Sequence, residues 1–77
     1  MHYIYFMIEN KLKIARVTHG NLTQAEVAEK VGCSRQTVNS IENNRFTPSV
    51  ELALRIAQLL QVRVEDIFFL ADSHEHV

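Results

Sequence analysis

Two short helical patterns in the middle of the chain are separated by only two residues, Gly32 and Cys33. Thr23 followed by Glu26 forms the T-x-x-E pattern of a capping box, which predicts the start of a helix. Gly32 suits the left-handed position that ends a helix, and Ser34 can cap a second helix directly afterwards. Two helices joined by so short a connection must cross steeply and pack closely.

Hydrophobic residues recur at helical spacing in both segments, and the expected inward positions are Val27, Ala28, Val31, Val38 and Ile41. Ala28 lies where the second helix should cross, and its small side chain lets the two backbones approach. Together with the caps and the turn, this spacing predicts a helix-turn-helix motif over residues 23–43.

The outward face of the second helix is polar, and the side chains expected there are Arg35, Gln36, Asn39 and Ser40. Arginine and glutamine are the types that read guanine and adenine edges bidentately in a major groove. The alternative is an ordinary helical hairpin with a solvated polar face. We favour DNA binding because the caps, the small residue, the glycine and the polar face fall in one register. The predicted recognition helix, residues 34–43, would lie in the major groove.

The charge distribution is compatible with DNA binding, although the net charge is −1. Residues 65–77 hold four of the nine Asp and Glu residues and no Lys or Arg. The first 64 residues therefore carry all eight basic side chains and five acidic ones. We expect the acidic end to point away from the phosphates and the binding to be strongly salt-dependent.

Several classes of protein are not expected. The chain has one cysteine, no apolar run of membrane-spanning length and no secretory signal pattern, which predicts a cytoplasmic protein without a membrane partner. No nucleophile–base spacing and no glycine-rich phosphate loop occur, so we expect neither an enzyme nor a cofactor. His74-Glu-His76 is interpreted as a frayed polar tail, and no metal site is predicted.

Residues 2–8 are mostly β-branched or aromatic, so the chain is expected to begin with a strand that is apolar on both faces. Such a strand needs a partner, and we interpret residues 1–8 as a dimerisation arm or a strand that pairs with the tail. A homodimer would hide it together with a pair of phenylalanines near the other end. The predicted dimer-interface residues are Tyr3, Tyr5, Met7, Phe68 and Phe69.

Three further helices are expected around the motif. The first opens at Glu9 or Asn10 and runs to about Thr18, with Gly20 as the residue that stops it, and the fourth is capped by Thr47 or Ser49 and runs to about Leu60. The last covers about residues 64–70. The helix-turn-helix domain therefore spans residues 9–70, and residues 71–77 are expected to form a disordered acidic tail.

Residues 10–70 resemble the Cro and phage-repressor type of helix-turn-helix regulator, the Xre family. The matching stretches are NKLKIAR, LTQAEVAEKVGCSRQTVNSIENN, TPSVELALRIAQLL and VRVEDIF. The resemblance implies an all-α, five-helix, lambda-repressor-like domain, here with a short N-terminal β-strand extension. It also implies a transcriptional regulator, more often a repressor, that binds an inverted-repeat operator as a homodimer.

The resemblance further implies roles for single residues. Those matching base-facing positions are Ser34, Arg35, Gln36, Asn39 and Ser40, and those matching phosphate-contacting positions are Gln24, Asn43 and Arg45. Arg16 and Glu42 match a charged pair that ties the first helix to the recognition helix. Asn44 and Gln61 stand where the family often has glycine, and Asn21 looks like an added residue.

Two other functions remain open at this point. One is a protein-interaction module, such as an antitoxin, whose strand and phenylalanine-rich end bind a partner protein. The other is a ligand-responsive or redox-responsive sensor, which would need an enclosed pocket or a reactive Cys33.

Overall fold

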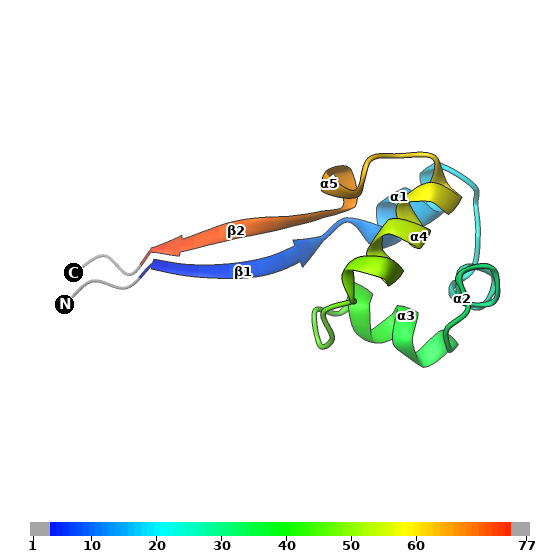
Figure 1. Cartoon of the computed structure of the whole chain (residues 1–77), viewed down its shortest axis with the longest axis horizontal. Coiled ribbons are helices and arrows are strands. Elements are labelled where there is room, and N and C mark those ends of the chain that lie inside the picture. Colours follow the sequence, from blue (N-terminus) through cyan, green and yellow to red (C-terminus); the bar gives the residue numbers. More distant parts are fainter. Residues whose placement is uncertain (1–3, 75–77) are drawn as a thin grey trace.

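A computed structural model describes residues 4–74, which form five helices and one two-stranded sheet (Figure 1). The helices are α1 (Leu12–Thr18), α2 (Gln24–Val31), α3 (Arg35–Glu42), α4 (Val50–Leu60) and α5 (Val64–Ile67). The strands β1 (Ile4–Asn10) and β2 (Phe68–His74) pair antiparallel along their whole length. We call this strand pair the ribbon. The helices cluster at one end of a molecule measuring 45 × 21 × 20 Å, and the ribbon projects from them.

The core lies between the helices and is built from the positions that carry the helical periodicity. Its fully buried large side chains come from all five helices: Leu12, Val27, Val38, Ile41, Ile56, Leu60 and Ile67. The small Ala28, 3% exposed, lies between α2 and its neighbours as the motif requires. Among the described residues, no helix combines the length and apolarity that crossing a bilayer demands.

The helix ends within the motif follow from local chemistry. The Glu26 backbone N–H donates to Thr23 Oγ1 at 3.0 Å, and the Thr23 N–H donates to Glu26 Oε1 at 2.8 Å. Ser34 Oγ accepts from the Thr37 N–H at 3.1 Å at the start of α3. Gly32 has φ +84°, and a β-carbon there would meet only the Arg55 guanidinium at 3.6 Å. The backbone angle, rather than lack of space, therefore favours glycine at this turn.

Within residues 4–74, three residues other than glycine adopt the left-handed conformation, and each ends or follows a helix. They are Asn21, Asn44 and Gln61, with φ of +48°, +59° and +58°. The turn after α1 therefore uses Asn21 and not Gly20, which was expected to end that helix. Ser49, one of the two expected caps, accepts from the Leu52 N–H at 3.1 Å and starts α4.

The two ends of the domain differ from the sequence prediction. Helix α5 stops at Ile67 instead of continuing to about residue 70, and residues 68–74 form β2 in place of a helical turn and a disordered tail. The strand expected over residues 1–8 is described from Ile4 and extends to Asn10, so α1 starts at Leu12, two or three residues later than expected. The aromatic run after Ile67 favours a strand once β1 supplies hydrogen-bonding partners. The domain is thus mostly helical, and the predicted all-α class needs this sheet added.

Replacing Ile56 by alanine should lower the free energy of unfolding by about 2–5 kcal/mol, because its side chain is 0% exposed and the cavity cannot fully collapse. Leu54→Ala, on the same helix but 51% exposed, should change it by less than about 0.5 kcal/mol. Urea denaturation of both variants measures the difference. Equal losses would show that α4 does not pack as described.

Candidate nucleic-acid interface

Helix α3 presents one polar face to solvent and buries the opposite one. Val38 and Ile41 are 0% and 1% exposed, which fixes the rotation of the helix about its axis. The predicted base-contacting side chains then fall outside: Ser34, Arg35, Gln36 and Asn39 are exposed, and Ser40 is half-buried. The buried stripe therefore determines which side chains α3 offers to a ligand.

Amide side chains from α2 and α3 are joined by hydrogen bonds on this face. Gln24 Nε2 donates to Asn39 Oδ1 at 3.1 Å and to Glu42 Oε1 at 2.9 Å. Asn43 Nδ2 donates to the Asn39 carbonyl at 2.9 Å and to Asn39 Oδ1 at 3.2 Å. The Asn39 side chain is thus held by neighbours on both sides, so its direction is set before any ligand arrives.

An ion pair between Arg16 and Glu42 ties α1 to the last turn of α3. Arg16 Nε donates to Glu42 Oε2 at 2.7 Å and Nη2 donates to Oε1 at 3.1 Å, with side chains only 12% and 5% exposed. Arg16 Nη1 also donates to the Leu22 carbonyl at 2.8 Å. Hydrogen bonding to Glu42 raises the pKa of Arg16 above its ordinary value, against the opposing effect of burial. The ion pair that the family resemblance implied between Arg16 and Glu42 is thus formed.

A shallow hollow lies beside the exposed face of α3 and is lined by Ser34, Gln36, Thr37, Ser40, Arg45 and Phe46. Arg45, a predicted phosphate contact, is exposed directly after the recognition helix. Phe46 is 49% exposed next to it and was not among the predicted site residues. The sequence signal that could have pointed to Phe46 is an aromatic residue next to a basic one between two predicted helices.

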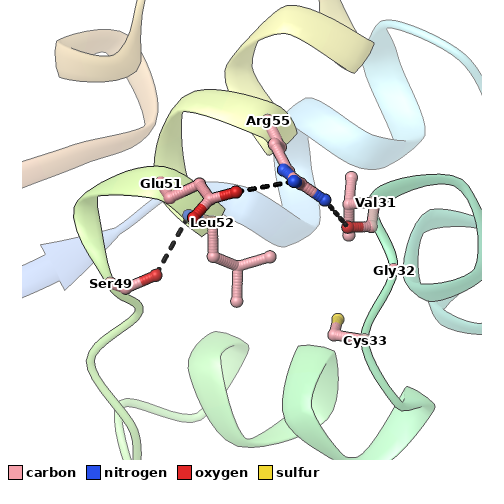
Figure 2. Close-up of a pocket in the computed structure, with 7 residues that line it drawn as sticks. All are labelled: Val31, Gly32, Cys33, Ser49, Glu51, Leu52 and Arg55. Carbon is pink, nitrogen blue, oxygen red and sulfur yellow. Dashed lines mark hydrogen bonds and ion pairs between the residues drawn. The ribbon is translucent and has the colours of Figure 1, made fainter.

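A second hollow lies behind the turn of the motif (Figure 2). Arg55 from α4 crosses it, donating to the Val31 carbonyl at 3.3 Å and to Glu51 Oε2 at 2.6 Å. Cys33 lies on its other side and is half-buried. Burial raises the pKa of its thiol, so the protonated and less nucleophilic form is favoured at neutral pH. This environment suits a packed cysteine better than a reactive one.

The residues predicted to form a dimer interface lie on the two strands of the ribbon, except one that is outside the described residues. Tyr3 lies outside the described residues, and Tyr5 and Met7 occupy positions on β1. Phe68 packs against the core of its own chain, and Phe69 lies under the Lys11 ammonium, 5.7 Å from the ring centroid.

The exposed apolar residues of the ribbon are others that sequence reasoning missed. Ile8 and Leu70, 43% and 62% exposed, lie directly opposite each other on β1 and β2. Their positions depend on strand register, which the sequence did not reveal.

Comparison with known proteins agrees with this geometry. A helix-turn-helix family model matches residues 12–67. A protein of Methanocaldococcus jannaschii named as an HTH-type transcriptional regulator is 48% identical over 66 residues, covering 86% of this chain and 98% of the relative. The Bacillus subtilis HTH-type transcriptional regulator YgzD is 37% identical over 67 residues, covering 87% of this chain and 100% of the relative. The similarity includes all five helices of the domain.

Glu42→Gln should lower the free energy of unfolding by about 3 kcal/mol, because it leaves the largely buried Arg16 guanidinium without its counter-charge. The matched control is Glu51→Gln, which breaks an ion pair with side chains 54% and 73% exposed and should cost less than about 1 kcal/mol. Chemical denaturation gives both values. Similar small losses would mean that the Arg16–Glu42 pair does not anchor α3.

Proposed function

Because this chain belongs to the Xre-type helix-turn-helix family of transcriptional regulators, we propose that it binds duplex DNA sequence-specifically through α3. Membership places it among DNA-binding regulators and not among enzymes. The observation that carries the proposal is the exposed polar face of α3 opposite the buried Val38 and Ile41. A helix of this diameter fits the major groove, where base edges differ in their donors and acceptors.

Arg35 and Gln36 are the proposed main base readers, because both are exposed near the start of α3 and both can form two hydrogen bonds to one base. Ser34, Asn39 and Ser40 are proposed to add contacts along the same face. The hydrogen bonds that hold Asn39 support this role, since a fixed side chain loses less conformational freedom on binding.

Gln24, Asn43 and Arg45 are proposed to contact phosphates on either side of the groove. Gln24 is the first residue of α2, where backbone N–H groups have no partner within the helix and favour an anion. Its side-chain amide is already bonded to Asn39 and Glu42, so we assign the phosphate contact chiefly to the backbone. Arg45 supplies the full positive charge of this group.

We propose that two copies associate through the ribbon. A two-stranded ribbon is marginally stable by itself in water, and this one exposes Ile8 and Leu70 on one face. In the described part of the chain, each strand pairs only with the other, so one edge of each strand stays open. A second ribbon would cover such surface, and twofold symmetry would place two α3 helices about 34 Å apart on an inverted repeat.

Such a dimer would regulate transcription by occupying its operator. A dimer on an inverted repeat would cover one face of the duplex over about two turns and exclude other proteins from it. Repression is the outcome we propose for a site that overlaps a promoter.

Gln36→Ala should weaken binding to the operator by about 10- to 100-fold, as expected for the loss of one bidentate base contact. The operator would first be selected from random duplex DNA with the unaltered chain. Gln58→Ala, an exposed glutamine on α4, is the matched control and should bind normally. Fluorescence anisotropy measures affinity, and circular dichroism checks the fold. Full selectivity in Gln36→Ala would contradict the assignment of α3.

Leu70→Lys should shift the chain from dimer toward monomer in sedimentation at micromolar concentration, because the new ammonium lies on the proposed apolar contact. Removing residues 1–7 should weaken association further by deleting most of β1. Leu54→Lys introduces the same charge on α4, at a residue 51% exposed, and should leave the dimer intact. An unaltered chain that sediments only as a monomer would refute the proposed dimer.

A further inference from the structure

Asn10, the last residue of β1, lies at the junction between the ribbon and the helices, and its side chain contacts two separate parts of the helical domain. Asn10 Nδ2 donates to the Ile41 carbonyl at 2.7 Å and to Asn44 Oδ1 at 2.8 Å. Asn10 Oδ1 accepts from the Leu12 N–H at 3.1 Å. One amide group thus connects the ribbon to the start of α1 and to the end of α3.

The chemistry of these contacts requires an amide of this length. The Ile41 carbonyl belongs to the last turn of α3 and also accepts from the Asn44 N–H at 3.0 Å, so the Asn10 amide is a further donor to this oxygen. The nearby Asn44 has φ +59°, and this left-handed turn presents its Oδ1 to the same Asn10 nitrogen. Aspartate could accept from Leu12 but could not donate to either oxygen. Asn10 therefore uses both its donors on the recognition helix and its following turn.

Backbone contacts hold the same junction from the other side. The Lys11 N–H donates to the Ile67 carbonyl at 2.8 Å, where α5 gives way to β2. Asn10 itself pairs with Phe68 in the ribbon, and Phe68 packs against the core. The base of the ribbon is therefore fixed to α5 by the main chain and to α3 by one side chain.

We propose that Asn10 is a positioning residue that fixes the direction of the ribbon relative to α3. The inference depends on the proposed function, because it requires both DNA reading by α3 and association through the ribbon. In a ribbon-mediated dimer, any swing of the ribbon would move the two recognition helices relative to each other. The Asn10 contacts would then select one separation of half-sites without touching DNA.

The test measures how strongly the dimer prefers the native half-site spacing. Binding of the unaltered chain and of Asn10→Ala would be compared on a half-site, on the native operator, and on operators lengthened or shortened by one base pair. We expect Asn10→Ala to bind the half-site and to dimerise as the unaltered chain does. Its preference for the native spacing should fall by about tenfold, a typical size for coupling between two sites.

Two further variants separate positioning from stability. Asn44→Gly keeps the left-handed turn but removes one acceptor, so it should lose part of the spacing preference. If Asn10→Ala fails to fold, Asn44→Gly is the variant on which the spacing preference is tested. Arg55→Ala removes contacts to Val31 and Glu51 away from the ribbon, and should lower thermal stability while keeping the spacing preference.

The outcomes distinguish the two proposals. An unchanged spacing preference in Asn10→Ala and Asn44→Gly overturns the positioning role alone. Failure of the unaltered chain to bind half-site DNA, or to form a dimer, overturns the proposed function and this inference with it. If Arg55→Ala lost as much of the preference for the native spacing as Asn10→Ala, the loss would reflect lower stability in general, and this result would also overturn the inference.

Discussion

The placement of α3 depends on the carboxylate of Glu42. It accepts from two nitrogens of Arg16 on α1 and from Gln24 on α2, so three helices meet at one acid. Hydrophobic packing alone resists sliding or tilting weakly, because it is non-directional. The bidentate geometry of arginine supplies the missing direction. The position of α3 against its neighbours is thus set by an ion pair, and its rotation about its own axis by the buried Val38 and Ile41.

The same acid links stability to the surface that faces solvent. Gln24 bonds to Glu42 and to Asn39, so the inner ion pair and the outer polar face belong to one hydrogen-bond network. A polar network of this kind restricts side chains that would otherwise sample several rotamers. The residues that hold the helices together would therefore also lower the entropic cost of the proposed DNA contacts.

The motif could be predicted from sequence because its determinants are local. Thr23, Glu26, Gly32 and Ser34 act within one turn of their own positions, and all four behave as expected. The family prediction rested on this segment together with three flanking stretches of residues 10–70, and it is confirmed by the comparisons. The Arg16–Glu42 pair was inferred only by resemblance, since spacing alone does not bring residues from separate helices together.

The pairing of the two ribbon strands could not be predicted from local sequence patterns. Phe68, Phe69 and Leu70 suit a helix turn or a strand equally well, and only pairing with a segment from the other end of the chain decides between them. The hydrogen bonds of Asn10 could not be predicted for the same reason, because its partners Ile41 and Asn44 follow much later in the sequence. No periodic pattern in the sequence indicates which distant segments pair with each other.

The pairing of β1 with β2 also orders events during synthesis. β1 is made first, yet its partner is made only after all five helices (Figure 1). Closing so long a loop is entropically unfavourable unless the intervening chain is already compact. The helices must therefore assemble before the two strands meet. A growing polypeptide on the ribosome could therefore fold its helices early and would complete the ribbon only after β2 had emerged.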